Sequence, residues 1–474
     1  MSSQDVPAII AASVSGLTLI ATVATQIIGF RSTRANTEQQ IQATRENTSD
    51  TLAEQREQLA TTLKAQSEQL KQTLGEQRTR TLNERFATAA DQLGSDKPAV
   101  RLAGVYAMAG LADDWEENRQ TCVDVLGAYL RMPYEPDPGE QAPAKERLAF
   151  QASREVRHTV IRVITAHLQE EAAVSWQGLD FDFTGVVFDG GDFYNAMFSG
   201  GTVGFSGARF SGGTVGFSGA RFSGGTVYFG DATFSAGTVD FSGAKFSGGQ
   251  VWFSRAKFSG GEVNFNAATF SGGKVWFIKA EFSGGEVNFD AATFSSGTVD
   301  FQGAEFSGGE IGFGATFSGG TVGFILATFS GAKVPFTAAT FSGGTVAFTG
   351  ATFSGGEVRF ANGATFSSGT VDFSGATFSG AKVAFSIATF SGAKVAFAGA
   401  TFSGGTVDFA GATFSGGTVD FTGGTSGLLT GATFSGAVVD FSSPGDWSSP
   451  PEFPWTGTPP PGVTLPKKED QSRA

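Results

Sequence analysis

The pattern of apolar and polar residues changes four times along the chain, and each change marks a predicted element. Residues 6–30 form an uncharged, mostly apolar run, and residues 37–85 are polar with apolar residues eleven positions apart. Residues 86–170 carry apolar residues at helical spacing, as in a small all-α domain. Residues 174–441 place a phenylalanine every five or seven positions, and residues 442–474 are rich in proline. We therefore expect an α+β multidomain chain in which helices precede a repetitive β region.

The apolar run from Val6 to Phe30 has the length of a transmembrane helix. Such a helix would extend about 37 Å, enough for a hydrocarbon core of about 30 Å. A signal peptide would have a basic start and a shorter apolar run, whereas only Asp5 is charged before this one. Arg31 and Arg34 follow it, and the positive-inside rule keeps them in the cytoplasm. We expect a single-pass protein of the cell membrane, bound to the lipid bilayer here, with the bulk of the chain cytoplasmic; a buried core helix is the alternative.

The polar segment 37–85 has the periodicity of a hendecad coiled coil. Its apolar rows repeat every eleven residues and consist of Ile41, Leu52, Leu63 and Leu74, and of Leu59 and Leu70. Eleven residues over three turns give about 3.67 residues per turn, so the seam should run almost straight or wind slightly right-handed. The seam is thin, which makes a lone helix marginal and favours a homo-oligomeric stalk. A solvated single-helix spacer is the alternative.

The predicted all-α domain, residues 86–170, offers little chemistry. An acidic cluster precedes a predicted helix, where the helix dipole favours negative charge, so we interpret it as a helix start rather than a metal site. The cluster is Asp113, Asp114, Glu116 and Glu117. His158 and His167 have no carboxylate or cysteine set around them in sequence and are interpreted as surface or packing residues. We expect no catalytic, cofactor or metal site, and we expect Cys122 to be buried.

The phenylalanine spacing defines a twelve-residue unit. From Phe198 the step alternates between seven and five, and the unit reads VDFSGATFSGGT at residues 407–418. Val or Ala stands two positions before nearly every Phe. A small and a large apolar residue recurring every five positions resemble the bacterial pentapeptide-repeat family, over about 260 residues. The chain departs from the usual family pattern in having Phe in place of the common Leu and a Gly-Thr pair after every second pentad.

The resemblance implies a right-handed, four-sided β-helix filled by these apolar side chains. The segment RLAGVYAMAGLADDWEENRQTCVDVLGAYLRMPYEP, residues 101–136, is similar to the α-helical domain that precedes such arrays in membrane-anchored members. The phenylalanines expected in the core include Phe205, Phe210, Phe229, Phe265, Phe289 and Phe409.

Two units should make one coil of about 24 residues. Outward residues match their neighbours at this spacing, as in the row of Asp240, Asn264 and Asn288. Stacked strands lie about 4.8 Å apart, so about eleven coils should form a rod about 52 Å long. Glycine after each Phe-Ser should supply turns with positive φ. Breaks in the spacing after Phe313, Phe360 and Phe421 are interpreted as bulges or loops.

Tyr228, Trp252 and Trp276 form the candidate partner-binding surface. They occupy the outward position between Val and Phe in three successive coils, whereas large aromatics are otherwise absent from the outward positions of the repeat units, where Gly, Asp, Ala and Thr dominate. Exposed aromatic clusters favour recognition surfaces. The alternative is a ladder that only stabilises the sheet by stacking.

Composition and charge narrow the function. The chain has 67 glycines, 48 phenylalanines, one cysteine, two histidines and a net charge of −13. One cysteine excludes a disulfide framework, and the acidic balance excludes nucleic acid as the main ligand. With no convergent polar site, we expect no enzyme but a membrane-tethered scaffold that binds an unknown protein partner.

Two other functions stay open. Some pentapeptide-repeat proteins resemble DNA and bind type II topoisomerases, although residues 174–441 hold 18 acids and 11 bases, a net charge of only −7. Rows of outward threonine, such as Thr352, Thr377 and Thr401, would suit surface or ice binding by an exported protein. The tail, 442–474, is expected to be disordered, with Trp447 and Trp455 folding back over the last coil or with a PxxP-type docking peptide.

Overall fold

The protein is described by a computed structural model. It covers residues 5–404, 406–422, 432–442, 453 and 455–467, with side chains described from residue 16. The chain divides into two compact units, Met1–Asn83 and Glu84–Ala474, and each is described by itself.

One helix, α1 (Asp5–Leu93), contains the predicted apolar segment, the predicted stalk and the first residues of the predicted all-α domain. The helix continues through the predicted boundaries near residues 30, 37 and 86. No proline stands between Pro7 and Leu93 to interrupt it. Among the residues whose side chains are described, no helix has both the length and the apolar character needed to cross a membrane. Residues 6–15 of the predicted span lie outside these residues.

Four helical segments form the all-α domain of the second unit. They are α2 (Pro98–Asp114), the 3-10 turn η1 (Glu116–Asn118), α3 (Arg119–Arg131) and α4 (Ala144–His167). Val105, Leu126 and Val160 are fully buried between them, as is Cys122. The interpretation of the acidic cluster as a helix start is wrong for Asp113 and Asp114, which form the last two residues of α2. The preceding part of α2 is rich in alanine, a strong helix former, and the helix continues through both aspartates.

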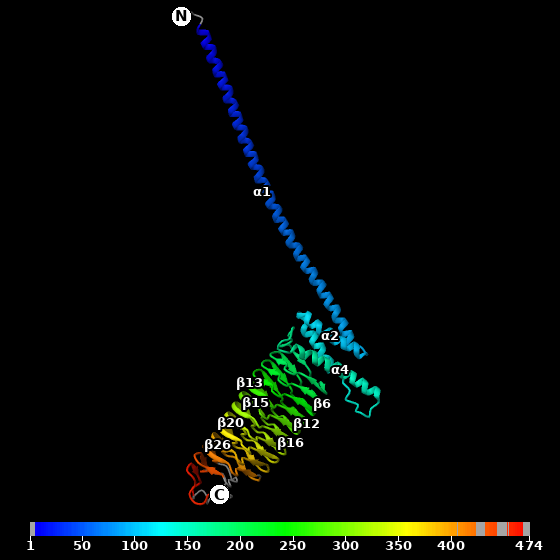
Figure 1. The fold of residues 1–474 in the computed structure, drawn as a ribbon, viewed down its shortest axis with the longest axis vertical. Coiled ribbons are helices and arrows are strands. Elements are labelled where there is room, and N and C mark those ends of the chain that lie inside the picture. Colours follow the sequence, from blue (N-terminus) through cyan, green and yellow to red (C-terminus); the bar gives the residue numbers. More distant parts are fainter. Residues whose placement is uncertain (1–4, 405, 423–431, 443–452, 454, 468–474) are drawn as a thin grey trace. The chain divides into compact units, whose positions relative to one another are not determined.

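The repeat region is a parallel β-solenoid built from two sheets (Figure 1). Within the described residues one sheet has 17 strands and the other has 15. The 17-stranded sheet contains β1 (Phe181–Asp182), β4 (Met197–Phe198), β5 (Thr202–Gly204), β7 (Arg221–Phe222), β8 (Thr226–Tyr228), β10 (Lys245–Phe246), β11 (Gln250–Trp252), β13 (Thr269–Trp276), β15 (Thr293–Asp300), β17 (Thr316–Gly323), β20 (Thr340–Ala347), β23 (Thr365–Asp372), β26 (Thr389–Ala396), β29 (Thr413–Asp420), β30 (Thr433–Phe434), β31 (Val438–Asp440) and β32 (Val463–Thr464). The 15-stranded sheet contains β2 (Val187–Phe188), β3 (Gly191–Asp192), β6 (Arg209–Gly216), β9 (Thr233–Asp240), β12 (Lys257–Asn264), β14 (Glu281–Asn288), β16 (Glu305–Gly312), β18 (Thr328–Phe329), β19 (Lys333–Pro335), β21 (Thr352–Phe353), β22 (Glu357–Arg359), β24 (Thr377–Phe378), β25 (Lys382–Ala384), β27 (Thr401–Phe402) and β28 (Thr406–Asp408).

The strand register confirms the coil of about 24 residues. Val251 pairs with Val275 and Phe258 with Phe282, each 24 positions further on. The solenoid has about eleven turns, as the sequence predicts. At two of the predicted breaks the step becomes 23, from Phe294 to Phe317, and 25, from Phe341 to Phe366. Each break is thus absorbed within one coil; the loop after Phe421 lies outside the described residues.

Four columns of stacked phenylalanines fill the solenoid. In one column Phe253 lies parallel to Phe229 and Phe277, with ring centroids 4.6 and 4.7 Å away. Across the core, Phe253 meets Phe265 edge to face at 6.0 Å. The core phenylalanines named from the sequence are at most 1% exposed: Phe205, Phe210, Phe229, Phe265, Phe289 and Phe409. Each ring therefore contacts its own column and a neighbouring one.

The paired glycines serve two different purposes. Gly273 has φ +67°, and it bends the strand at the corner of the coil. Gly272 before it is not in the left-handed region, but a Cβ there would overlap the carbonyl oxygen of Ser247 in the preceding coil. The expectation that the first glycine after each Phe-Ser has positive φ is therefore wrong at the paired sites, where close backbone approach requires that glycine. It holds at the other corner, where Gly219 has φ +67°.

Both ends of the solenoid are covered. Helices α3 and α4 pack on β1 and β3 of the first coils, and Trp176 is fully buried there. At the other end β32 pairs with β31, and Trp455 packs edge to face on Phe434 at 5.2 Å. Residues 455–467 of the tail, for which composition predicts disorder, therefore cap the last coil, whereas Trp447 lies outside the described residues.

Candidate functional site

The aromatic side chains singled out in the sequence form one ladder on the 17-stranded sheet. Tyr228, Trp252 and Trp276 end β8, β11 and β13 and pair directly in register. The rings of Tyr228 and Trp252 lie 6.3 Å apart, and those of Trp252 and Trp276 lie 3.9 Å apart. The structure thus brings all three into one continuous stack.

Stacking decides which parts of these rings a partner can reach. The faces of Trp252 are turned to its two neighbours, so the stack presents mainly ring edges and its two end faces. Tyr228 is 38% exposed, while both tryptophans are half-buried. The Lys274 ammonium lies 5.7 Å from the centroid of Trp276, which suits a cation–π contact. The exposed ring edges suit contact with a complementary protein surface. A planar ligand would need an exposed ring face on which to stack, and only the two ends of the ladder offer one.

One polar atom in the ladder is left without a partner. The Trp252 Nε1–H is buried and has no hydrogen-bond acceptor among the described residues. In the next coil the residue paired with Trp276 is Asp300. Burial raises the pKa of its carboxyl group, and a backbone hydrogen bond from Gln302 only partly offsets this. Since unpartnered buried groups destabilise a fold, the indole N–H of Trp252 carries a local cost.

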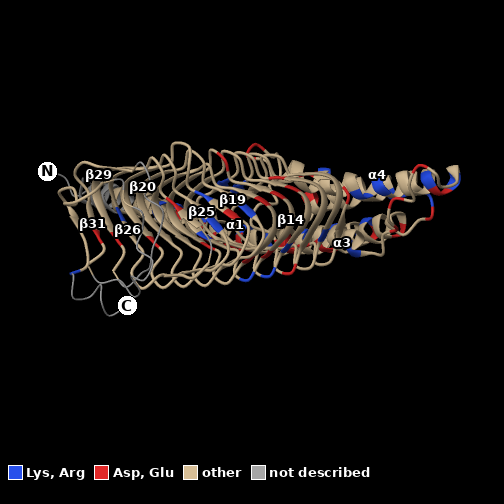
Figure 2. Cartoon of the chain, turned by 90° about the horizontal axis from the view of Figure 1, so that it is seen from below, with Lys and Arg blue, Asp and Glu red and all other residues tan. Residues whose placement is uncertain are grey.

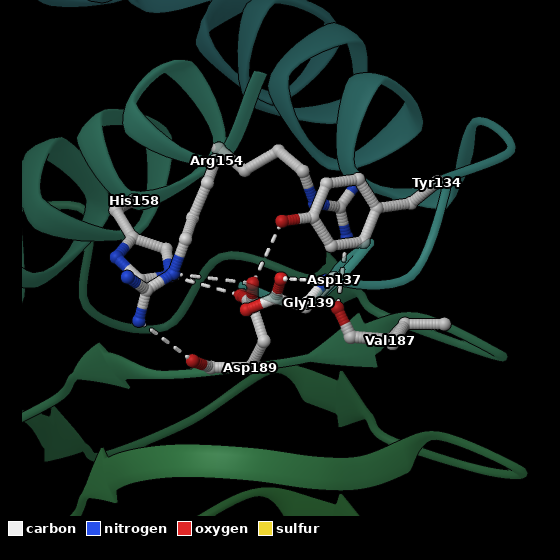
Figure 3. Close-up of polar contacts among 8 residues, drawn as sticks. Tyr134, Asp137, Gly139, Arg154, His158, Val187 and Asp189 are labelled. Carbon is white, nitrogen blue, oxygen red and sulfur yellow. Dashed lines mark hydrogen bonds and ion pairs between the residues drawn. The ribbon is translucent and has the colours of Figure 1, made fainter. Parts of the chain in front are cut away.

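A second polar cluster, which we call the Asp189 cluster, joins the helical domain to the first coils. Asp189 follows β2 and receives hydrogen bonds from Tyr134 Oη at 2.7 Å and from His158 Nε2 at 3.0 Å (Figure 3). Arg154 of α4 pairs with the same carboxylate at 3.2 Å and donates to the Asp189 carbonyl at 3.0 Å. One aspartate of the solenoid therefore binds two side chains of α4 and one of the preceding loop.

Burial and hydrogen bonding oppose each other at this aspartate. Burial raises the pKa of Asp189. The hydrogen bonds from His158 and Tyr134 and the charge of Arg154 together lower it by more, so the pKa lies below its usual range. Burial and the bond to Asp189 raise the pKa of the Tyr134 phenol. The cluster is thus held as a carboxylate with neutral and cationic donors around it.

Buried Arg157 supports the Asp189 cluster from inside. It is 4% exposed and donates to the carbonyls of Leu130 at 2.8 Å and Val187 at 3.0 Å. Its guanidinium lies 4.2 Å from the centroid of the Tyr134 ring, which it therefore holds in place for Asp189.

His167 occupies a similar joint at the other end of α4. Its ring stacks on Trp176 with centroids 4.0 Å apart, and its Nε2 lies 3.2 Å from the Asp113 carboxylate. Trp176 donates to the same carboxylate at 3.0 Å. Both histidines thus contact carboxylates 31 and 54 residues away in sequence, which no local motif indicated.

A groove beside the Asp189 cluster is a candidate for a small-molecule site. Its volume is about 790 Å³, and its lining includes Tyr134, Asp137, Arg154 and Arg209. The polar groups of Tyr134 and Arg154 are already engaged by Asp189. Among the described residues no three His, Cys, Asp or Glu side chains are arranged to hold a metal ion.

Aspartates that stand between Val and Phe, six of the 18 acidic residues in 174–441, have a local role. The side-chain oxygen of Asp240 accepts the N–H of Ser242 at 2.9 Å, and Asp300 and Asp372 bind the N–H groups two positions ahead in the same way. Such turns close the corner of the coil. Figure 2 shows acidic and basic residues interspersed along the solenoid rather than gathered on one acidic face.

Comparison with known proteins identifies the repeat but no relative. Residues 183–233 match the family model described as pentapeptide repeats (9 copies). No curated protein and no solved structure matches the chain significantly. The match covers the first coils, and the parallel pairing of equivalent positions continues to β31, where Val419 pairs with Val439. In its repeat region, the chain is therefore similar to pentapeptide-repeat proteins.

Proposed function

We propose that this protein is a non-enzymatic, membrane-tethered scaffold whose β-solenoid binds a partner protein along the aromatic ladder. The observation that carries the proposal is the in-register stack of Tyr228, Trp252 and Trp276, in a row that continues as Gly204 on one side and Asp300 on the other. Tyr and Trp are enriched where proteins bind proteins, since they bury much area at little entropic cost. A solenoid with a packed phenylalanine core holds such a ridge in a fixed geometry.

The membrane tether rests on the apolar run in the sequence. In its described part the large apolar side chains are exposed: Leu17 is 68%, Ile20 is 67% and Phe30 is 77% exposed. Apolar helix surface of this extent requires a cover, and a bilayer supplies one. Deleting residues 1–30 should move the protein from the membrane to the soluble fraction. A full-length chain that remains soluble without detergent would contradict the tether.

A catalytic role has little support. The groups around Asp189 are committed to joining α4 to the first coils, and the donors of Arg157 face backbone carbonyls. DNA mimicry has little support either, because residues 174–441 carry 11 basic residues among 18 acidic ones, and aspartates such as Asp240, Asp300 and Asp372 are used to close turns.

The partner surface can be tested by capture from the native cell. The full chain carrying Trp252→Thr and Trp276→Thr is compared with Thr345→Ala, which changes an outward residue of β20 on the same sheet. We expect the double variant to lose partners that the wild type and the control retain, at a temperature at which all three are folded. If the double variant captures the same proteins as the wild type, the ladder only stabilises the sheet and the proposed partner surface is wrong.

A further inference from the structure

The stalk part of α1 carries an exposed apolar row with a strict period. Phe30, Ile41, Leu52, Leu63 and Leu74 stand eleven residues apart. They are 77, 47, 49, 55 and 55% exposed, respectively. A helix rises 1.5 Å per residue, so the row extends about 66 Å along one side of α1. Leu59 and Leu70, both 59% exposed, lie next to it.

The two edges of this apolar seam differ in charge. A step of four residues from the row reaches one edge and a step of three reaches the other. The first edge holds Arg45, Arg56 and Arg78, four positions after Ile41, Leu52 and Leu74. The second edge holds Gln55, Gln66 and Gln77, three positions after Leu52, Leu63 and Leu74. One edge is therefore cationic and the other is neutral and able to accept hydrogen bonds.

We propose that the seam binds a second copy of this chain, in parallel and in register, through the apolar row of Ile41, Leu52, Leu63 and Leu74. In a parallel pair the symmetry axis runs along the seam, so unlike edges meet and each arginine edge faces a glutamine edge. In an antiparallel pair like edges meet, and the arginines of one helix would face those of the other. Repulsion between like charges disfavours that arrangement, and glutamine carbonyls accept from arginine in the parallel one.

Parallel pairing has a consequence for the proposed scaffold. All N-termini lie at one end, as attachment to a single membrane surface requires, and the copies each carry one aromatic ladder. Two linked ladders raise the apparent affinity for a multivalent partner without any new contact. The pairing itself does not depend on the proposed partner surface, so its test is independent of the ladder variants.

Position-specific cross-linking of the full chain in detergent tests the proposal. Chains carrying Leu52→Cys and chains carrying Leu74→Cys are first oxidised separately. They are then given different tags, mixed and oxidised together, so that a disulfide between positions 52 and 74 can be recognised. The native thiol should not interfere, because burial raises the pKa of Cys122 to about 11. Disulfides need Cα atoms within about 7 Å, so each variant should cross-link to itself, and the tagged mixture should give no 52-to-74 product. Glu57→Cys, on the far side of the helix, is the matched control.

The expected result is cross-linked dimer on the order of tenfold above the Glu57→Cys level. A further variant, Gln55→Arg with Gln66→Arg and Gln77→Arg, should lose the dimer at low salt and regain it at high salt, since both edges then carry arginine. Three results would each overturn the proposal. They are self-cross-linking no higher than that of the control, a dominant product that links position 52 to position 74, and a monomeric mass by light scattering. A monomer that retains a different protein on the stalk would assign the seam to that protein instead.

Discussion

Trp252 and Trp276 stack one coil apart with ring centroids separated by 3.9 Å, less than the spacing of adjacent strands. Rings projecting straight out from neighbouring strands would stand further apart, so the two indoles lean toward each other. The contact makes them one unit with Tyr228, which stacks on the other face of Trp252 at 6.3 Å. A change at the middle ring therefore affects two contacts, and a change at either end affects one.

The first prediction concerns this middle ring. Trp252→Thr should destabilise the array by about 1–3 kcal/mol, because stacked aromatic pairs contribute about 0.5–1.5 kcal/mol each. Trp252→Phe keeps a ring and removes the buried N–H that has no described partner, so its change should be under about 1 kcal/mol. Thermal unfolding of the two variants checks this. Equal losses for Thr and Phe would contradict this prediction, because the phenyl ring of Phe can still stack and only an N–H without a partner is removed.

The second prediction concerns the phenylalanine columns. Phe265 is fully buried between Phe241 and Phe289, at 4.8 and 4.7 Å, so Phe265→Ala should cost about 3–5 kcal/mol. In a repeat protein the loss falls on the coils beside the cavity, so hydrogen exchange should rise first in β12 and β14. Thr345→Ala on the surface serves as control. A loss under about 1 kcal/mol in denaturant titration would contradict an inward-packed ring at this position.

The repeat geometry could be predicted from the sequence because each coil constrains the next. Trp252 and Trp276 match at 24 positions since they occupy the same place in stacked strands, and this periodicity is visible without coordinates. The separate role of Gly272 was not visible, because both glycines of a pair look alike and only the neighbouring backbone distinguishes them. The contact between His158 and Asp189 joins two regions with different periods, so neither period indicates it. Trp455 illustrates the limit of composition: a proline-rich tail can still cap an apolar end.

The third prediction separates backbone strain from close packing. Gly243 has φ +65° with open space around it, so Gly243→Ala should cost only the left-handed penalty of about 1–2 kcal/mol. Gly272→Ala should cost more, because its Cβ would meet the Ser247 backbone, which cannot move without displacing a strand. Conversely, Ile387 has φ +62° and is 63% exposed, so Ile387→Gly should stabilise the array by about 1 kcal/mol. Chemical denaturation of the three variants should give this order, and a destabilising Ile387→Gly would contradict it.

The last prediction concerns the pH dependence of the Asp189 cluster. The folded pKa of Asp189 lies below its usual range, because the hydrogen bonds and positive charge of its partners outweigh burial. A carboxyl group whose pKa is lowered by folding adds stability above its unfolded pKa, about 3.9, and loses it as the pH falls through the folded value. Asp189→Asn should therefore destabilise the attachment of α4 at neutral pH by about 1–3 kcal/mol. The difference from wild type should shrink as the pH is lowered below about 4.

Asp231 provides the matched control for this pH effect. Its pKa is also lowered, through the hydrogen bonds of Arg255, but the two side chains are 55 and 64% exposed. Water and salt screen such a pair, so Asp231→Asn should have a small effect that disappears at high ionic strength. The Asp189 side chain is only 19% exposed, and its effect should persist in salt. Hydrogen exchange at pH 7 and pH 3, with and without salt, measures the effect of Asp189→Asn in α4 and that of Asp231→Asn in β9 and β12. Equal salt sensitivity of the two would show that Asp189 acts as a surface charge and not as the joint between α4 and the solenoid.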